Sequence, residues 1–348
     1  MIWAVWSGIE GEQFFTKFLL YKSKKKIKNI RYINEIFLQR EKLFQYAKNK
    51  KIQIVNLDQV KNPDLVDLFI FFDMPNFNHS LIKSFFKYNK KFVLIINESK
   101  DIYPHNFKKK YHKYFKFVFT WNDNQVDNKK YFKLYWGVKL LKNYLTKIKK
   151  KKLVCMINTN RIINYNKTLY SLRLKVIKWF ESNNSNEFDL YGIDWDKRFF
   201  YFKFKIFRII NRISFITKFL KYDFKNYRGA INPSLINKIN ILKKYKFSII
   251  IENSLTNGWI TEKIFHCFFS STVPIYLGAP NVSEYIPKNC FIDLRKFNTT
   301  KDMFDYIKNL DNNTYEKYIK NINKFLKTKK YHKFDIDFNM NILLKKIH

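Results

Sequence analysis

One polar loop of this chain, residues 252–263, combines residue types that bind a phosphate group. The loop follows the apolar run 247–251, and Thr261 occupies the position of a helix N-cap, directly before Glu262 and Lys263. A helix that begins at the carboxyl end of a parallel strand points unpaired N–H groups at the crevice where α/β proteins bind ligands. Lys263 adds a full positive charge there. The pattern suits a phosphate, although an ordinary capped helix would need only Thr261 and Glu262, and both interpretations stay open.

A second polar position follows an apolar run in the first half of the chain. Glu98 comes shortly after residues 92–96, so its carboxylate lies at the crevice end of an expected strand. The alternative is that it caps the next element. His105 and His112 follow nearby without the spacing of metal ligands, and we interpret them as surface or packing residues.

The elements that must position these residues alternate between strands and helices. Short apolar runs rich in β-branched and aromatic residues indicate buried parallel strands. They are residues 68–72, 92–96, 115–119, 153–157, 188–191, 247–251, 273–277 and 290–294. Amphipathic helices are expected between them, for example at 169–180, 262–269 and 301–310. This alternation predicts an α/β fold with parallel sheets.

The length of 348 residues exceeds what one hydrophobic core usually organises, so two domains are expected. The lysine run at 149–152 marks the boundary between them. We therefore predict an N-terminal domain over residues 1–148, a C-terminal domain over 149–330, and a C-terminal tail over 331–348.

The composition is that of a folded, strongly basic protein. Hydrophobic residues make up 46% of the chain and aromatic residues 19%, which excludes general disorder. A net charge of +39 attracts nucleic acid, anionic lipid or a phosphorylated substrate, but it does not choose among them. A coding bias toward solvated lysines explains the same charge.

Cysteine usage and hydropathy indicate where the chain resides. The three cysteines, Cys155, Cys267 and Cys290, lie in apolar stretches without paired spacing, as expected for buried free thiols in a reducing compartment. Glu10 and Glu12 interrupt the apolar N-terminus, and no apolar stretch of about 18 residues occurs. We expect a cytoplasmic protein without a membrane span.

Residues 197–228 depart from the alternation of strands and helices. They interleave ten Lys or Arg and eleven Phe or Tyr with a single acid, Asp223. The segment is interpreted as an insertion whose aromatic residues pack on the second domain, or as an interfacial element that binds anionic lipid. Stacking on single-stranded nucleic acid would use similar residues. Peripheral association with the inner face of a membrane is therefore a hypothesis.

A longer pattern joins the polar loop to the strand that follows it. The loop carries Glu-Asn-Ser at 252–254 and Thr-Glu-Lys-Ile at 261–264, and Val-Pro-Ile-Tyr-Leu-Gly-Ala-Pro follows at 273–280. Together these residues resemble the signature of the α-1,3-fucosyltransferase family, glycosyltransferase family 10, in its bacterial form. The likeness continues at residues 191–192, 245–247, 285–287 and 290–293, and in 96–122, which ends in Phe-Thr-Trp-Asn.

This resemblance implies a GT-B fold, in which two Rossmann-like domains face each other. It implies that the N-terminal domain serves the acceptor and that the C-terminal domain binds a GDP-sugar. The positions that match the family then carry expected roles. Lys263 contacts the donor phosphates and Glu262 the fucose hydroxyls, while Asn253 belongs to the same donor loop. Trp259 stands where bacterial members often have Tyr, and Arg173 falls where the family places an arginine on the pyrophosphate, a contact that suits a planar guanidinium.

The resemblance also assigns the catalytic base. Glu98 would take the proton from the acceptor hydroxyl, while Arg173, Lys263 and the helix start at Thr261 would stabilise the departing GDP. One carboxylate acting as a base implies a single displacement that inverts the anomeric centre. GDP-β-L-fucose would then yield an α-linked product on a glycan acceptor. The resemblance implies a role in the glycosylation of proteins or lipids, or in the biosynthesis of lipopolysaccharide or another surface glycan.

No other cofactor signature is present. The sequence lacks Gly-x-Gly, a Walker-type loop and zinc spacing, and Asp194 and Asp196 are interpreted as part of a solvated turn because the family has no metal site there. We expect a metal-independent enzyme whose only nucleotide is its donor. The alternatives are a transferase that uses another GDP-sugar, or a basic nucleic-acid-binding protein, which would not account for Glu98 and Glu262. Nucleic acid is not an expected partner.

Overall fold

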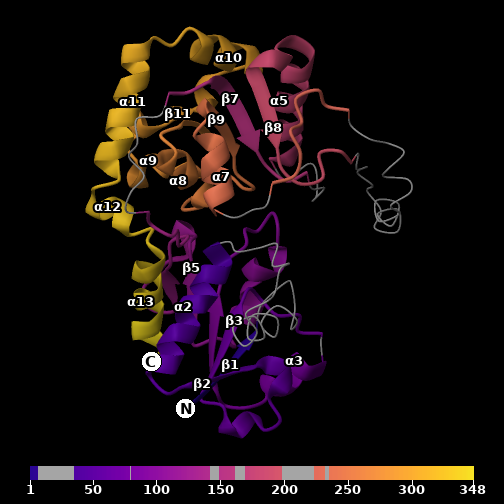
Figure 1. Cartoon of the computed structure of the whole chain (residues 1–348). Coiled ribbons are helices and arrows are strands. Elements are labelled where there is room, and N and C mark those ends of the chain that lie inside the picture. Colours follow the sequence, from indigo (N-terminus) through magenta and orange to yellow (C-terminus); the bar gives the residue numbers. More distant parts are fainter. Residues whose placement is uncertain (7–34, 79, 142–148, 161–168, 198–222, 232–234) are drawn as a thin grey trace. The chain divides into compact units, whose positions relative to one another are not determined.

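The computed structural model describes residues 1–6, 35–78, 80–141, 149–160, 169–197, 223–231 and 235–348 (Figure 1). The chain divides into two compact units. Unit 1 contains Met1–Lys139, Asn257–Trp259 and Lys333–His348, and unit 2 contains Leu140–Thr256 and Ile260–His332.

Unit 1 is built on a parallel sheet of six strands in the order β2-β1-β3-β4-β5-β6. The strands are β1 (Ile2–Trp6), β2 (Gln53–Asn56), β3 (Leu68–Phe72), β4 (Lys91–Ile95), β5 (Phe117–Thr120) and β6 (Tyr131–Lys133). Its helices are α2 (Glu35–Asn49), α3 (Ser80–Phe85), α4 (Lys109–His112) and α13 (Ile336–Ile347). Every residue of β3 is buried, as expected for a central parallel strand.

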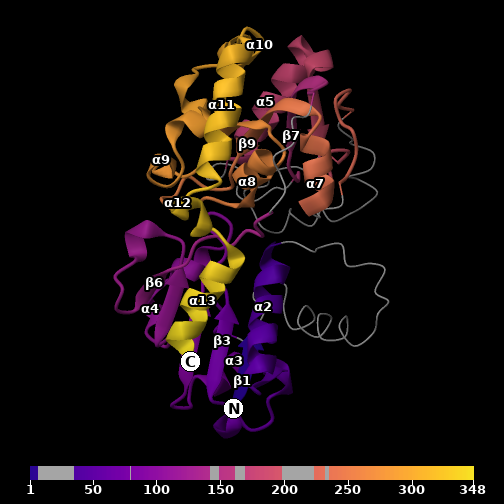
Figure 2. The same cartoon turned by 60° about the vertical axis from the view of Figure 1, so that its left-hand side comes forward.

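Helices cover both faces of the unit 1 sheet. On one face, α2 and α13 pack side by side against alternate residues of the strands, such as Ile70 and Phe72 (Figure 2). On the other face, Ile82 and Phe85 of α3 pack with the intervening residues, and the ring of Phe85 contacts that of Phe69. This alternation follows from the two-residue period of a strand.

Unit 2 is a second parallel α/β layer structure, with five strands in the order β11-β10-β9-β7-β8. The strands are β7 (Lys152–Ile157), β8 (Phe188–Tyr191), β9 (Tyr245–Ile251), β10 (Val273–Leu277) and β11 (Ile292–Asp293). The helices are α5 (Tyr170–Asn183), α7 (Leu235–Leu242), α8 (Glu262–Phe269), α9 (Val282–Tyr285), α10 (Thr300–Lys308), α11 (Asn312–Phe325) and α12 (Lys329–His332).

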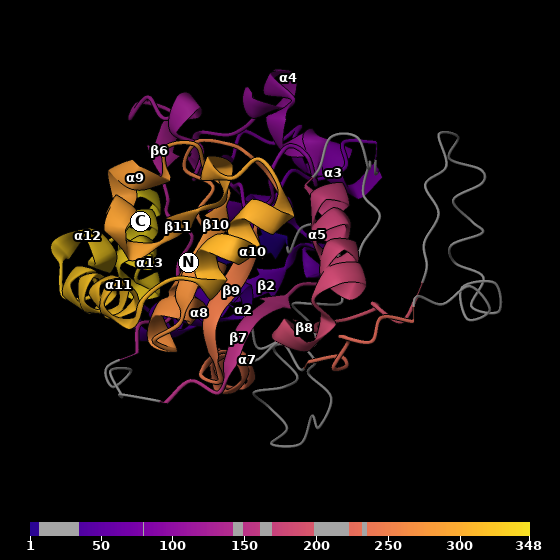
Figure 3. The same cartoon turned by 90° about the horizontal axis from the view of Figure 1, so that it is seen from above.

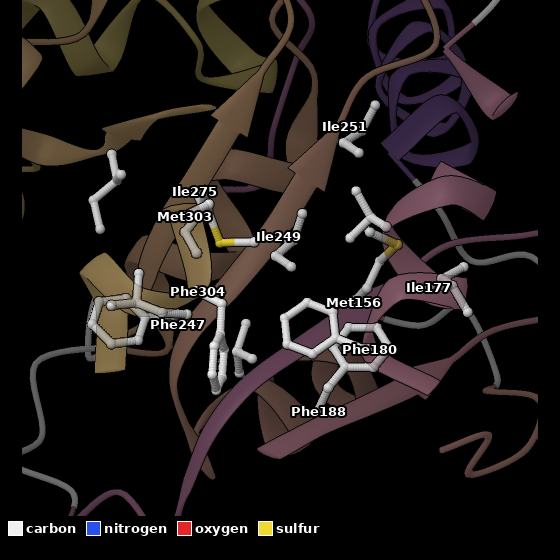
Figure 4. Packing of buried hydrophobic residues seen from close by; sticks show 14 of the residues in the cluster. Met156, Ile177, Phe180, Phe188, Phe247, Ile249, Ile251, Ile275, Met303 and Phe304 are labelled. Carbon is white, nitrogen blue, oxygen red and sulfur yellow. The ribbon is translucent and has the colours of Figure 1, made fainter. Parts of the chain in front are cut away.

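The core of unit 2 lies between its sheet and helices α5 and α10 (Figures 3 and 4). Phe180 of α5 stacks on Phe188 of β8, with ring centroids 4.4 Å apart, and also contacts Phe304 of α10. Helices α7 and α8 pack on each other, and α8 also contacts β9 and β10. The sheet is therefore buried on both faces, which explains the nearly continuous apolar sequence of β9 and β10.

The predicted elements can be compared with those of the structure. Three strand predictions and the helix at 262–269 match β3, β8, β10 and α8 exactly. Of the other predicted strands, β4 and β5 are shifted, β11 is shorter, and β7 and β9 begin earlier than predicted. The thiols are confirmed as free and buried. The strands β1, β2 and β6 were not predicted; β6 has only three residues, all half-buried.

The division of the chain differs from the predicted domain ranges 1–148, 149–330 and 331–348. The units change over at Lys139 and Leu140, and residues 333–348 are not a tail but part of unit 1. The reason is the apolar face of α13, where Met340, Leu343, Leu344 and Ile347 are buried against the unit 1 sheet.

Candidate active site

The strand order of unit 2 places a topological switch point between β7 and β9. The chain runs from β7 outward to β8 on one side and returns to β9, β10 and β11 on the other. Ligands of open α/β sheets bind outside the carboxyl ends of strands at such a point. Two of the predicted donor residues come from the segments that leave these strands. Arg173 lies on α5, after β7, and Asn253 follows β9 directly.

Arg173 is held at the carboxyl end of β9. Its Nε and Nη2 donate to the carbonyl oxygen of Ile251 at 3.0 and 2.5 Å, and Nη2 also donates to Oδ1 of Asn253 at 2.8 Å. The guanidinium lies over the ring of Tyr170, 4.4 Å from its centroid. Only 2% of the residue is exposed, so Arg173 is not a solvated helix cation. Burial lowers the pKa of its guanidinium. The structure thus brings together two of the predicted donor residues, Arg173 and Asn253.

Lys263 is paired with a carboxylate to which the sequence analysis gave no role. Its Nζ donates to Oε2 of Glu252 at 2.5 Å and to Oγ1 of Thr261 at 3.2 Å. The side chain of Glu252 is completely buried, whereas 23% of the Lys263 side chain is exposed. The partly exposed cation therefore sits over a buried anion at the start of α8.

Thr261 is the N-cap residue of α8, as predicted, but its side chain makes no capping hydrogen bond. Its hydroxyl donates to Oε1 of Glu252 at 2.6 Å, and its backbone N–H donates to the same oxygen at 3.2 Å. The carboxylate of Glu252 thereby links the end of β9 to the first turn of α8. The absence of a side chain at Gly278 allows this, because a Cβ there would lie 2.7 Å from Cγ of Glu252.

Glu262 lies near several cations, one of which is Lys263. Its carboxylate lies 3.8 Å from Nζ of Lys238 on α7, and its side chain is 16% exposed. Burial alone would raise the pKa of Glu262, but Lys238, Lys263 and His266 together outweigh it and hold the pKa at about 2. Glu262 therefore carries a full negative charge at neutral pH and is a hydrogen-bond acceptor.

Trp259 lies in a different part of the loop. Residues 257–259 group with unit 1, where the Trp259 ring makes edge contacts with Trp121 and Trp136 at centroid distances of 4.4 and 5.3 Å. The preceding Gly258 has φ 81°, and a Cβ on it would lie 2.2 Å from the carbonyl oxygen of Trp121. A glycine is required at this close approach.

Glu98 lies just beyond the carboxyl end of β4 in unit 1, and its side chain is half-buried. Its backbone N–H donates to Oδ1 of Asp73 at 3.0 Å, and the same oxygen accepts from the N–H of Asn97 at 2.8 Å and from Nδ2 of Asn106 at 2.6 Å. Asp73 follows β3 with φ 62°, in the left-handed region. Burial raises the pKa of Asp73 more than these hydrogen bonds and the charge of Arg40 lower it.

The remaining polar candidates have packing partners. Nδ1 of His112 lies 3.0 Å from the hydroxyl of Tyr131 and its Nε2 lies 2.8 Å from the carbonyl oxygen of Asn106, while burial lowers its pKa. Asp194 accepts from Nζ of Lys197 at 2.6 Å in a turn. Within the described part of the chain no group of three or more His, Cys, Asp or Glu could hold a metal ion. Most of the predicted interfacial segment 197–228 lies outside the described residues.

Part of the chain matches the model of a known protein family. The model of the C-terminal part of glycosyltransferase family 10 (fucosyltransferase) matches residues 215–341. That range contains Asn253, Thr261, Glu262 and Lys263, together with the strand and helices that position them. This part of the chain is similar to the C-terminal domain of that family. The match confirms the resemblance that the motifs at 252–264 and 273–280 indicate.

Similar curated proteins are fucosyltransferases from a bacterium, a plant and vertebrates. The α-(1,3)-fucosyltransferase FucT of Helicobacter pylori is 36% identical over 83 residues, which are 24% of this chain and 17% of that protein. The α-(1,4)-fucosyltransferase of Arabidopsis thaliana is 39% identical over 69 residues, 20% of this chain and 17% of that protein. GDP-fucose protein O-fucosyltransferase 3 of Xenopus laevis is 40% identical over 86 residues, 24% and 18%. The matched segments span about a sixth of these relatives.

Solved structures resemble the whole chain. An α1,3-fucosyltransferase matches with a TM-score of 0.54 and 17% identity over 100% of this chain and 89% of that one. An α-glucosyltransferase in complex with UDP and DNA matches with a TM-score of 0.54 and 12% identity over 99% and 98%. The two parallel α/β sheets and these matches confirm the predicted GT-B fold.

Two acids of these clusters, Glu252 and Asp73, were not among the predicted site residues. Glu252 was visible as the first residue of the Glu-Asn-Ser motif, and an acid directly after an apolar strand was its signal. Asp73 gave the same signal after residues 68–72. Neither pattern says which side chains the acid will meet, because its partners come from other elements.

Proposed function

We propose that this protein is an inverting fucosyltransferase that moves L-fucose from GDP-β-L-fucose to a hydroxyl of a glycan acceptor. The observation that carries the proposal is the cluster of Arg173, Asn253, Glu252 and Lys263 at the carboxyl end of β9. Three of these residues, Asn253, Glu252 and Lys263, lie in the range that the fucosyltransferase family model matches. A related solved α1,3-fucosyltransferase is described in complex with GDP, and another in complex with GDP-fucose. These names support a GDP-sugar as the donor here.

In the proposed reaction, unit 2 stabilises the leaving group. As the bond between the sugar and GDP breaks, negative charge develops on the diphosphate, and preorganised cations lower the energy of that state. Lys263 supplies an ammonium at the start of α8, and Arg173 supplies a planar guanidinium fixed by Ile251 and Asn253. The ionised Glu262 would accept hydrogen bonds from hydroxyls of the sugar.

The proposed base is Glu98 of unit 1. It would take the proton from the acceptor hydroxyl as that oxygen attacks the anomeric carbon. The new bond to the acceptor forms as the bond to GDP breaks, so a β-linked donor gives an α-linked product. Asp73 would hold the backbone on which Glu98 is carried, since one carboxylate oxygen accepts from the N–H groups of both Asn97 and Glu98. Because the cations would serve the leaving group, we propose that no metal is required.

The cluster also supports a second donor. Arg173 and Lys263 would bind the diphosphate of any GDP-sugar, so a transferase that uses another GDP-sugar fits the same contacts. We further propose that the protein acts in the cytoplasm, at the inner face of a membrane that carries its acceptor. No helix in the described part of the chain is long and apolar enough to cross a bilayer.

Protection by the donor nucleotide tests this proposal against nucleic-acid binding. A ligand at about 100 times its dissociation constant stabilises the folded state by about 2.7 kcal/mol. We expect GDP to raise the melting temperature in the presence of EDTA, and an oligonucleotide of equal phosphate content to raise it much less. Equal protection by both would indicate non-specific binding of phosphate, and loss of GDP protection on chelation would indicate a metal site.

A further inference from the structure

Glu252 occupies an unusual position for a carboxylate next to a phosphate site. A phosphate is an anion, so a nearby acid would repel it, yet Glu252 lies beside the lysine that would bind the diphosphate. Its side chain is completely buried. An ionised carboxylate is costly to bury unless it is paired and hydrogen-bonded, so the partners of Glu252 must offset this cost.

The carboxylate is well satisfied by groups of the first turn of α8. Oε1 accepts from both the N–H and the hydroxyl of Thr261, and Oε2 accepts from Nζ of Lys263. The hydroxyl of Thr261 accepts in turn from Nζ of Lys263 at 3.2 Å. Two acceptors thus fix the position of the ammonium, and both depend on Glu252.

The surroundings of Lys263 show why this matters for its charge. Burial lowers the pKa of Lys263, and so does the charge of Arg173 on α5. The charges of Glu252 and of Glu262, the neighbour of Lys263 on α8, oppose these effects and raise the pKa of Lys263 above the ordinary value for lysine. Around these acids stand Lys238 of α7 and His266 of α8 beside Glu262, and Tyr276 of β10 beside Glu252.

We propose that Glu252 is a positioning residue for the donor diphosphate, because its buried carboxylate keeps Lys263 in the ammonium form and fixes the direction of that group. Glu252 then contributes to GDP binding without contacting GDP. This inference rests on the proposed function, since it concerns the phosphate site of a GDP-sugar transferase.

The variant Glu252→Gln tests the inference. Glutamine keeps the shape and one acceptor oxygen, but it removes the negative charge. The pKa of Lys263 should fall in this variant, because burial and the charge of Arg173 lower it and only Glu262 remains to raise it. Lys263 would lose its proton as the pH rises through that lowered pKa, and GDP would lose a charge-assisted contact.

The measurement is calorimetric titration with GDP at about pH 7 and about pH 9. We expect Glu252→Gln to bind GDP roughly tenfold to a hundredfold more weakly than wild type. We also expect its affinity to fall further at the higher pH by a factor that wild type does not show. The matched control is Glu316→Gln, which removes an exposed carboxylate from α11 and should leave GDP affinity unchanged.

A double-mutant cycle separates this role from a purely structural one. In a Lys263→Met background there is no ammonium to hold, so Glu252→Gln should change GDP affinity less than about threefold. An equally large loss in that background would contradict the inference, as would GDP binding by Glu252→Gln at least as tight as wild type at both pH values. Failure of folded wild type to bind GDP would contradict the proposed function instead.

The double variant also decides the case in which Glu252→Gln does not fold. An unpaired buried ammonium is itself destabilising, so removal of Lys263 as well should restore cooperative unfolding. If Glu252→Gln/Lys263→Met remained unfolded, Glu252 would be needed for reasons unrelated to Lys263, and the inference would be wrong.

Discussion

The two cations of the proposed donor site are held in different ways, and this decides how their removal should act. Arg173 is buried and donates to a backbone carbonyl, whereas the ammonium of Lys263 is partly exposed beside Glu252. Loss of Arg173 removes protein contacts together with a phosphate contact. Loss of Lys263 mainly removes charge that would face the ligand, although it also leaves Glu252 without its partner.

We predict that Lys263→Ala and Arg173→Ala each weaken GDP binding by roughly 1.5 to 3 kcal/mol, the usual value of a hydrogen bond to a charged group. Arg173→Ala should also lower the free energy of unfolding, because the carbonyl of Ile251 loses its donors. Titration with GDP and denaturant unfolding measure the two effects. Lys175→Ala, an exposed change on α5, is the control. Unchanged GDP affinity in both variants would mean that the phosphates bind elsewhere.

Glu98 tests the mechanism rather than the affinity. Glu98→Gln keeps the shape of the side chain but cannot accept the proton, so kcat should fall by roughly 10² to 10⁴. GDP affinity and melting temperature should stay near wild type, because a base acts mainly in the transition state. If Glu98 only caps the next element, the variant should instead lose about 1 kcal/mol of stability and keep its turnover. Measuring all three quantities on one preparation separates these cases.

At the scale of elements, α8 concentrates charge in its first turn. Glu262 has a pKa of about 2 in the folded protein against an ordinary value of 4.5. A carboxyl whose pKa is lowered by folding contributes stability that is present above the higher value and is lost as the pH falls toward the lower one. The acids and bases of this turn therefore link the stability of unit 2 to pH.

We predict that Glu262→Gln has a lower free energy of unfolding than wild type near neutral pH, and that this difference shrinks as the pH falls from about 4.5 to about 2. Denaturant unfolding at several pH values measures it. Glu316→Gln, a change at an exposed position of α11, should show no such convergence. A constant difference over the whole range would mean that the charge of Glu262 contributes nothing to stability.

The sequence predicted most central elements of both sheets because their burial is written in continuous apolar runs. Leu68–Phe72 and Val273–Leu277 are strands from end to end. Elements whose identity depends on distant partners could not be found this way. Residues 331–348 were predicted to be a tail, because no local pattern indicates that Leu343 and Leu344 cover a sheet whose strands, such as 68–72, lie some 270 residues earlier in the chain.

The candidate site divides along the same line. The motif placed Asn253, Thr261 and Lys263 at one strand end, and the structure brings them together there with Arg173. The partners of these residues were not predictable. Arg173 is sealed against Ile251, and Glu252 receives Lys263, through contacts that only the packing of α5 and α8 on β9 creates.

At the scale of the whole molecule, the net charge of +39 predicts attraction to anionic surfaces. We expect the protein to bind vesicles that contain anionic lipid, and to bind them more weakly at high salt because salt screens the attraction. A variant that lacks residues 198–222 should bind less, since this part of 197–228 interleaves cations with aromatic residues. Co-sedimentation measures it. Equal vesicle binding by the variant would favour the interpretation of this segment as a packed insertion. The charge of the remaining residues would then explain the binding.

Product analysis tests whether the protein transfers fucose from GDP-fucose. The protein is incubated with GDP-β-L-fucose, or with another GDP-hexose, and a panel of glycan acceptors, and the linkage of any product is determined by NMR. We predict a fucosylated glycan with an α linkage, formed faster than any product from the other donor and formed more slowly by Lys263→Ala. A β-linked fucoside would contradict inversion. Transfer of another sugar in preference to fucose, or no transfer from any GDP-sugar, would contradict the proposed donor.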